Sequence, residues 1–385
     1  MKKRFLRDIA EIQTGPFGSQ LHKEDYVDVG TPIVTVEHLG SRVFSEQNLP
    51  MVSEADKSRL SKYVLKKGDI VFSRVGSVDR CSFVDQKHDG WMFSGRCLRV
   101  RPNEEVDSLF LYYFFCLNAT KEFVRSIAVG ATMPSINTKL LGEVEVICPE
   151  IEEQRKIADI LSKIDDKIEE NQKINENLEQ QAKAIYQQMF IENTSPNWAE
   201  GSLRDIADIT MGQSPSGSSY NEDGIGTIFF QGRAEFSFRF PTIRLYTTEP
   251  KRMAYANDIL MSVRAPVGDL NIAHTDCCIG RGLAAIHSKT NHQSFVLYTM
   301  FSLRKQLDVF NGEGTVFGSI NRNSLNDMPI LIPSDETIEE FEKIVAPMDA
   351  AIRNNYDEIC RLQAVRDSLL PRLMSGELDV SSLDI

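Results

Sequence analysis

The sequence predicts an α+β protein: two repeated α/β domains that are separated and joined by two long antiparallel coiled-coil helices. Motifs recur in the same order, since LRDIAEI from Leu6 returns as LRDIADI from Leu203, and GDIVFSRVGS from Gly68 is answered by NDILMSVRAPVG from Asn257. Each copy is followed by a long charged stretch with apolar residues at helical spacing. We therefore predict the order domain, helix, domain, helix, with boundaries 1–150, 151–194, 195–333 and 334–385.

Length and charge agree with this plan. The chain has 385 residues, enough for two or three domains of about 150 residues each. Its net charge of −12 argues at first against nucleic acid. Most of the excess acid, however, lies in the two predicted helical segments, and the two domains are close to neutral. A near-neutral domain can bind DNA if its cations are clustered.

Compartment and redox state follow from two further patterns. No apolar run approaches the roughly 18 residues of a membrane helix, and the N-terminal residues turn charged before a signal-peptide core could form. The seven cysteines show no CxxC or zinc spacing. We expect a cytoplasmic protein with reduced, mostly buried thiols and no metal or other cofactor.

The first domain is expected to consist of short strands and turns with a few helices between them. Its apolar runs are short, rich in Val, Ile, Phe and Thr, and bounded by Gly, Pro, Asn and Asp. The aromatic stretch 108–127 has helical spacing and is expected to be core. The second domain repeats these features, and its stretch from Gln293 corresponds to the aromatic helix of the first.

The two long helices carry matched heptad columns. Every seventh residue is apolar except the third member of each column, which is Asn171 in the first helix and Asn355 in the second. A buried Asn at such a position fixes the register of a coiled coil. We predict that the two amides lie close together and set this register. Pro347 is expected to kink or restart the second helix near Ala346.

Several catalytic patterns are absent from the sequence. It lacks the Asn/Asp-Pro-Pro-aromatic tetrapeptide of adenine methyltransferases and the GxxxxGK[ST] phosphate loop. Glu249-Pro250-Lys251 is a lone ExK without a positioned upstream acid, and the six histidines form no metal-binding pair. These absences predict a protein without catalytic activity of its own.

Two segments are specific enough to indicate a family: EEQRKIADILSKID at 152–165 and LLPRLMSGEL at 369–378. Through these segments and the repeated motifs, essentially the whole chain resembles the DNA-specificity subunits of type I restriction-modification enzymes. This resemblance implies two target-recognition domains that each read one half of a split double-stranded DNA site. It also implies a helical spacer that docks two methyltransferase subunits, with restriction/translocase subunits joining through the complex.

Candidate DNA contacts are Arg, Lys, Gln, Asn, Ser and other polar residues at strand ends and in loops, because these side chains can bond to phosphates and base edges. In the first domain they are Ser19, Gln20, Lys23, Glu37, His38, Arg74, Arg80, Arg96, Asn137 and Lys139. In the second domain they are Gln213, Ser214, Ser216, Ser218, Tyr220, Gln231, Arg233, Arg264, Arg281, Asn321, Arg322 and Asn323.

The repeat sorts these candidates into two groups. Positions shared by both halves, which we take to be Arg96 with Arg281 and Asn137 with Asn321, are expected to hold the DNA backbone. Unshared positions, such as Glu37 against Gln231, are expected to read bases. Two alternatives of other classes stay open at the level of sequence: a protein-interaction scaffold built on the acidic coiled coil, and a self-sufficient nuclease.

Overall fold

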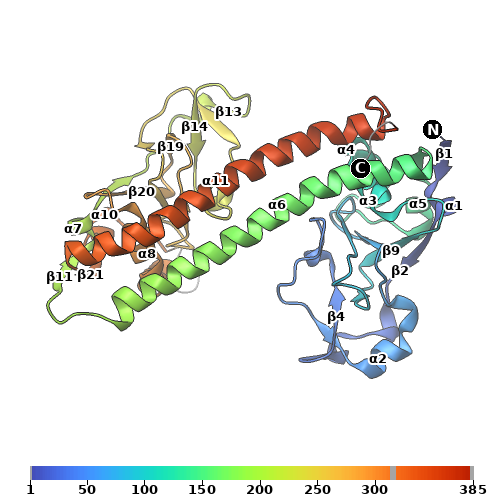
Figure 1. Ribbon diagram of the computed structural model, residues 1–385, viewed down its shortest axis with the longest axis horizontal. Coiled ribbons are helices and arrows are strands. Elements are labelled where there is room, and N and C mark those ends of the chain that lie inside the picture. Colours follow the sequence, from blue (N-terminus) through green and yellow to red (C-terminus); the bar gives the residue numbers. More distant parts are fainter. Residues whose placement is uncertain (1, 313–317, 382–385) are drawn as a thin grey trace. The chain divides into compact units, whose positions relative to one another are not determined.

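A computed structural model describes residues 2–312 and 318–381. Residues 313–317 lie outside the described residues. The chain divides into unit 1, residues 1–171 with 357–385, and unit 2, residues 172–356. Each unit contains one globular domain and parts of the long helices α6 (Ile151–Tyr186) and α11 (Asp335–Met374) (Figure 1).

The first domain is built on an antiparallel sheet of order β2-β9-β6-β7, a second sheet of order β3-β5-β4-β8, and the ladder β1-β10. Its strands are β1 (Lys2–Phe5), β2 (Ala10–Thr14), β3 (Tyr26–Val27), β4 (Thr31–Val34), β5 (Met51–Val52), β6 (Ile70–Ser73), β7 (Cys81–Phe83), β8 (Met92–Phe93), β9 (Cys97–Pro102) and β10 (Glu145–Cys148). Its helices are α1 (Leu6–Ile9), α2 (Glu54–Arg59), α3 (Ser108–Cys116), α4 (Asn118–Ser126) and α5 (Thr138–Gly142).

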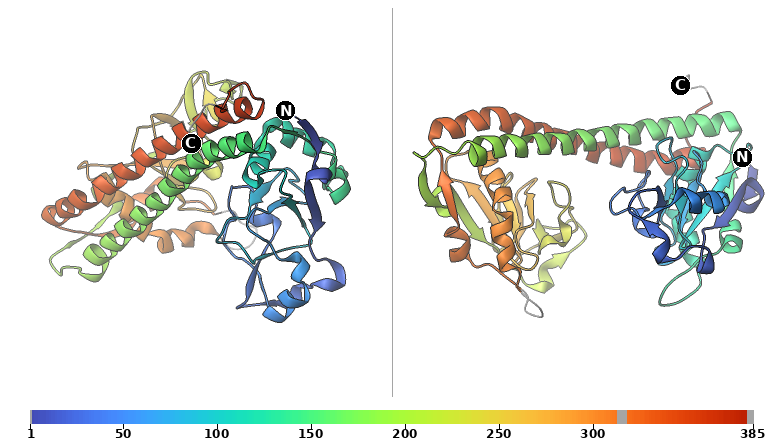
Figure 2. Two further views of the ribbon diagram at one scale, coloured as in Figure 1. Left: turned by 45° about the vertical axis from the view of Figure 1, so that its right-hand side comes forward. Right: turned by 90° about the horizontal axis from the view of Figure 1, so that it is seen from below.

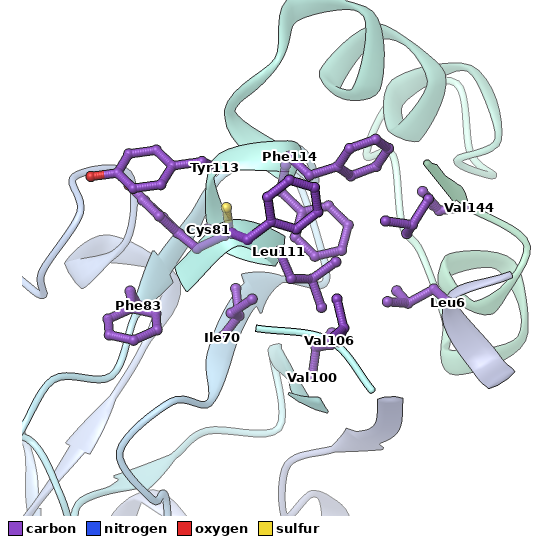
Figure 3. Packing of buried hydrophobic residues seen from close by; sticks show 14 of the residues in the cluster. Leu6, Ile70, Cys81, Phe83, Val100, Val106, Leu111, Tyr113, Phe114 and Val144 are labelled. Carbon is purple, nitrogen blue, oxygen red and sulfur yellow. The ribbon is translucent and has the colours of Figure 1, made fainter. Parts of the chain in front are cut away.

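The core of the first domain lies between its antiparallel sheet and α3. Helix α3 starts where the Asp107 carboxylate accepts hydrogen bonds from the N–H groups of Leu109 and Phe110. Its aromatic side chains are buried, as predicted, and the ring centres of Phe115 and of Phe72 in β6 lie 4.7 Å apart, edge to face. Figure 3 shows this packing, in which Ile70 and Val100 of the sheet lie near Leu111. Every residue of β6 is buried, which explains why Ile70, Val71 and Phe72 are all apolar. Phe123 of α4, which the prediction for the stretch 108–127 also placed in the core, is instead 42% exposed.

The second domain repeats this architecture. Its sheets have the orders β12-β20-β17-β18 and β13-β15-β14-β19-β16, with the ladder β11-β21. Its strands are β11 (Ala199–Ser202), β12 (Ala207–Met211), β13 (Tyr220–Asn221), β14 (Thr227–Phe230), β15 (Leu245–Thr247), β16 (Met253–Ala254), β17 (Ile259–Ser262), β18 (Leu270–Ile272), β19 (Cys277–Ile279), β20 (Leu283–Ser288) and β21 (Pro329–Ile332). Its helices are α7 (Leu203–Ile206), α8 (Gln293–Ser302), α9 (Arg304–Asp308) and α10 (Arg322–Asn326).

The long helices pack antiparallel within each unit, along one side of that unit's domain (Figure 2). In unit 1, Ile157 and Leu161 of α6 share the domain core with Leu370 and Leu373 of α11. In unit 2, the Tyr186 ring of α6 meets the Phe341 ring of α11 at 5.7 Å. Helix α6 continues as a turn of π-helix over Gln187–Glu192, so the helical segment ends close to the predicted boundary at residue 194.

The expected restart of the second helix at Pro347 is wrong, because α11 runs through this position. Proline removes one N–H from the helix ladder. The apolar residues on both sides, Val345 and Ile352, are buried, and this packing holds the helix across the missing bond.

The predicted pairing of Asn171 with Asn355 is also wrong. Asn171 is buried and donates to Glu358 Oε2 at 2.9 Å in unit 1, whereas Asn355 donates to Asn175 Oδ1 at 2.8 Å in unit 2. The antiparallel register therefore places each heptad Asn opposite another polar residue of the facing helix, a few positions from its own counterpart. Both amides still find partners, as the cost of an unpartnered buried amide requires.

Candidate nucleic-acid interface

Three segments of the first domain meet beside the ends of its antiparallel sheet, and we call this place the strand-end corner: residues 15–17, 74–76 and 94–96. The Gly15 N–H donates to the carbonyl of Cys97 at 3.2 Å, and the Arg74 N–H donates to the carbonyl of Arg96 at 2.8 Å. The Arg74 side chain donates to the Gly95 carbonyl at 3.2 Å. Its guanidinium lies 5.8 Å from the Phe17 ring centre, and this ring is 61% exposed.

The second domain has the same corner in residues 212–214, 263–265 and 280–282. The Gly212 N–H donates to the Leu283 carbonyl at 2.9 Å, and the Val263 N–H donates to the Gly282 carbonyl at 2.9 Å. Arg264 and Arg281 are exposed there and border a hollow of about 540 Å³.

Backbone contacts explain the first glycine of each corner. A β-carbon on Gly15 would lie 2.1 Å from the Ser94 carbonyl oxygen, and one on Gly212 would lie 2.2 Å from the Gly280 carbonyl oxygen. Any side chain would therefore push the loop away from the sheet. The two domains hold the corner by the same close approach of backbones.

The backbone bonds also correct the predicted pairing of arginines between the halves. Because the carbonyls of Arg96 and Gly282 accept equivalent bonds, Arg96 corresponds to Gly282, and Arg281 corresponds to Gly95. The sequence motifs instead align Gly95-Arg96 with Gly280-Arg281, which is one residue out of register with the backbone bonds. The isolated bridges of Val75 with Ser135 and of Arg264 with Ser319 show that Arg264 corresponds to Val75.

The pairing of Asn137 with Asn321 agrees with the structure. Asn137 begins α5 and accepts from the Leu140 N–H at 2.9 Å, while Asn321 begins α10 and accepts from the Ser324 N–H at 2.9 Å. Each residue is therefore a helix cap. Both are also exposed, so DNA could reach them. Further exposed candidates beside these caps are Lys139, Arg322 and Asn323.

Other predicted contacts already have partners inside their own domains. His38 is buried, with Nδ1 bonded to the Thr35 N–H at 3.0 Å and Nε2 3.1 Å from the Gln47 carbonyl, so its ring is not part of an open surface. Arg80 donates to the Leu39 carbonyl, and Arg233 pairs with Asp269. Gln20 accepts from the Tyr63 hydroxyl at 2.6 Å. Of Ser19 and Lys23 the structure gives the backbone, in short 3₁₀ turns.

The remaining candidates lie in two loops of the second domain. The Ser214 hydroxyl accepts from the Arg281 N–H at 3.2 Å, which places it at the corner with the exposed Gln213. Ser216 and Ser218 are exposed and bonded to each other, and the Tyr220 hydroxyl donates to the Pro215 carbonyl at 3.1 Å. Gln231 and Glu37 are both exposed, but their predicted pairing is wrong. The carbonyls of Val34 and Phe230 accept equivalent bonds from the N–H groups of Ser94 and Gly280, so Gln231 corresponds to Thr35.

Phe17 is a feature of the corner that the list of polar candidates missed. An apolar ring between Pro16 and Gly18 in a turn is a weak sequence signal, because turn residues are usually polar. Its large exposed fraction and its contact with Arg74 become visible only in the folded domain.

Metal sites and membrane-spanning helices are two further features that bear on function. Among residues 2–312 and 318–381, no three His, Cys, Asp or Glu side chains are grouped so that they could hold a metal ion. No helix in this described part of the chain is long and apolar enough to cross a membrane. The cysteines with described surroundings are free, and Cys360 is exposed.

Comparison with known proteins agrees with the duplicated fold. Residues 1–180 and again 196–360 match the protein family described as Type I restriction modification DNA specificity domain. The chain belongs to this family and carries two such domains.

Relatives of the chain bear matching names. One, from Methanocaldococcus jannaschii and named as the MjaX type I restriction enzyme specificity subunit, is 29% identical over 98% of this chain and 94% of its own length. The MjaIX specificity subunit of the same organism is 24% identical over 98% and 93%. The crystal structure of the type I restriction-modification S subunit from M. genitalium has a TM-score of 0.62 at 17% identity, covering 97% of this chain and 95% of that one. This last likeness concerns the fold.

Proposed function

We propose that the chain binds a bipartite double-stranded DNA target, with one half-site read by each domain. The observation that supports this is the duplicated corner, in which equivalent backbone bonds present different side chains. The first domain offers Phe17, Arg74 and Arg96, and the second offers Ser214, Arg264 and Arg281. A shared backbone suits the shared geometry of a duplex, and the differing side chains suit two different base sequences.

The chemistry of these side chains fits base reading in the major groove. An exposed arginine can bond in bidentate fashion to O6 and N7 of guanine, and a phenyl ring can contact a thymine methyl group. Helix caps such as Asn137 and Asn321, with neighbouring cations, suit contacts to phosphate, which position the protein without reading sequence.

The helices serve protein partners in this proposal. Helices α6 and α11 carry most of the chain's excess acid, which disfavours contact with phosphate. We infer that they dock two methyltransferase subunits, through which the restriction/translocase subunits join. The chain then supplies specificity and no catalysis, in the cytoplasm, where the DNA is. Turnover by the purified chain on duplex with a divalent metal would instead favour the nuclease alternative.

Exchanging one domain tests whether each domain recognises its half-site independently of the other. Methylated sites in the source genome are mapped first, which gives the two half-sites. Residues 195–333 are then replaced by the matching segment of another family member, and the methylated sites are mapped again. One half-site should change and the other should stay. A change in both half-sites, or the absence of any bipartite site, would contradict the proposal; a purified complex with one methyltransferase subunit instead of two would contradict the docking part.

A further inference from the structure

Each domain has a largely buried arginine in the loop after β4 or β14, which we call the reading loop because it carries the candidate base contacts Glu37 or Gln231. Arg42 follows Glu37 between β4 and β5, and Arg239 follows Gln231 and Arg233 between β14 and β15. The two arginines are equivalent, because the carbonyl of each accepts a 2.7 Å hydrogen bond from the next strand pair, Phe83 N–H in one domain and Ile272 N–H in the other.

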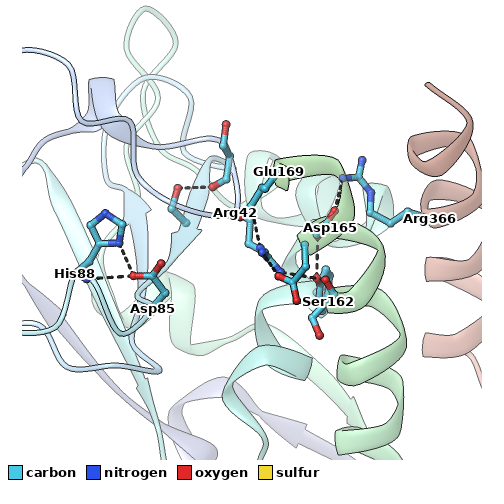
Figure 4. A network of polar contacts seen from close by, with 11 residues as sticks. Arg42, Asp85, His88, Ser162, Asp165, Glu169 and Arg366 are labelled. Carbon is cyan, nitrogen blue, oxygen red and sulfur yellow. Dashed lines mark hydrogen bonds and ion pairs between the residues drawn. The ribbon is translucent and has the colours of Figure 1, made fainter. Parts of the chain in front are cut away.

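In unit 1, Arg42 reaches out of its loop to helix α6 (Figure 4). Its Nε donates to Glu169 at 2.8 Å, one terminal nitrogen pairs with Asp166, and the other donates to the Ser162 carbonyl at 3.3 Å. Its side chain is 13% exposed. Burial alone lowers the pKa of this guanidinium, but the hydrogen bonds to Glu169 and Asp166 more than offset burial and hold the pKa above its ordinary value.

A tyrosine and an aspartate stand beside this ion pair. The Tyr113 hydroxyl of α3 donates to Asp165 of α6 at 2.8 Å, and Arg366 of α11 donates to the same carboxylate at 2.8 Å. The pKa of Tyr113 is raised, first by burial and then by Asp165, so the hydroxyl stays protonated and keeps donating. The network thus joins loop, domain core and both helices of unit 1.

Unit 2 repeats the arrangement with equivalent residues. Arg239 donates to the Tyr298 hydroxyl at 2.5 Å and to Asp349 at 2.9 Å, and its Nε lies 2.9 Å from Glu179. The Tyr298 hydroxyl also donates to Asp349, at 3.0 Å. The Arg239 side chain is 2% exposed. Here the loop arginine itself contacts both helices, Glu179 on α6 and Asp349 on α11.

Arg239 and its partners Glu179 and Asp349 are largely buried, whereas Asp166 beside Arg42 is 65% exposed. Burying such charges is costly, and a fold that needed only stability could replace them with apolar side chains. An arginine with several acceptors can instead fix the orientation of the loop that carries it. The guanidinium is planar and rigid, so the loop must hold one orientation for all the acceptors to be reached together. The same group of loop arginine, α-helical tyrosine and spacer aspartate is present in both units, at the place where a reading loop meets the helices.

We propose that Arg42 and Arg239 are positioning residues, which fix the orientation of each reading loop on the spacer helices and thereby the number of base pairs tolerated between the half-sites. This inference rests on the proposed function. It assigns to the loop arginines no contact with bases. It predicts that loss of either arginine lowers the selectivity for spacer length and leaves the affinity for a single half-site nearly unchanged.

The test uses the full chain in complex with its methyltransferase, and duplexes whose spacers are correct or one base pair longer or shorter. Arg42→Gln and Glu169→Gln remove the same ion pair from its two sides, and Arg239→Gln and Asp349→Asn do so in unit 2. Arg4→Gln is the matched control, since Arg4 of β1 pairs with Glu105 at 2.5 Å, and neither residue lies on the long helices or among the candidate DNA contacts. A duplex with one half-site measures reading alone.

We expect the single-half-site affinity of each variant to stay within about twofold of the parent, and the preference for the correct spacer to fall about tenfold. The control should keep the parent's preference. If Arg42→Gln fails to fold, Arg42→Lys keeps the charge but not the fork, and it should show the same loss of spacer selectivity. An unchanged spacer preference in the folded variants, or an equal loss at the single half-site, would overturn the inference. Failure of the parent to select any spacer would instead count against the proposed function.

Discussion

Arg281 offers the sharpest test of base reading by the second domain. Its side chain is exposed, and its backbone N–H bonds to Ser214 Oγ at 3.2 Å, a bond that Arg281→Ala retains. The corner should therefore keep its shape, and the free energy of unfolding should change by less than about 0.5 kcal/mol. Any loss of DNA affinity then comes from the missing guanidinium.

The size of that loss depends on what the guanidinium contacts. A bidentate bond to guanine contributes about 1 to 3 kcal/mol of discrimination, or roughly 5-fold to 150-fold in affinity for the cognate site. The loss should disappear on duplexes whose guanine in the second half-site has already been replaced, since the two changes remove one interaction. A phosphate contact would weaken all sequences alike and reduce the salt slope by about one.

The assay is fluorescence anisotropy with the purified complex and bipartite duplexes, each with one base pair changed in either half-site. Lys3→Ala is the control, because Lys3 is an exposed cation of β1, outside the corner and the long helices, and its ion pair with Glu145 is 3.4 Å long. Base reading by Arg281 would be refuted if its loss were spread over changes in the first half-site, or if the variant bound the cognate duplex like the parent.

Further predictions concern the fold. Asn137→Ala and Asn321→Ala each remove a helix cap and should cost about 1 kcal/mol of unfolding free energy, measured by urea denaturation; Asn→Ser, which can still cap, should restore most of it. Burial raises the pKa of Glu342 in the folded state, so its ionisation opposes folding above the ordinary value of 4.5. Glu342→Gln should therefore raise the melting temperature at neutral pH, and the gain should vanish as the pH falls below about 4; a gain that persists at low pH would contradict this assignment. A thiol reagent should label Cys360 fastest, as the exposed cysteine; faster labelling of the buried Cys97 would show that the domain opens.

The architecture could be predicted because the sequence contains it twice. Repeated motifs define domains, and apolar residues at seven-residue steps define long helices, both of which depend on near neighbours in the chain. The register between the helices could not be predicted in the same way. Asn171 faces Glu358 rather than its heptad counterpart, because register depends on how both helices pack on their domains.

The equivalence of residues in the two strand-end corners could not be predicted from the sequence motifs. Gly95-Arg96 and Gly280-Arg281 look equivalent as letters, yet the carbonyl bonds displace them by one residue. Loops between strands can place an arginine on either neighbouring position without altering the sheet, and in a strand one step turns a side chain to the opposite face. A displaced arginine is thus a way to change which side chain a shared backbone presents.

The contacts of the loop arginines Arg42 and Arg239 could not be predicted from the sequence either. Arg42 and Glu169 are far apart in sequence, and neither lies in a repeated motif, so only the fold brings them together. The equivalence of Arg42 with Arg239 is likewise carried by the backbone bonds of Phe83 and Ile272 rather than by surrounding letters. A duplicated protein of this kind can vary its corner residues to read new bases only while its loops stay fixed on the helices. Selection on base reading and selection on spacing should therefore fall on different residues, the exposed corner for the first and the buried arginine networks for the second.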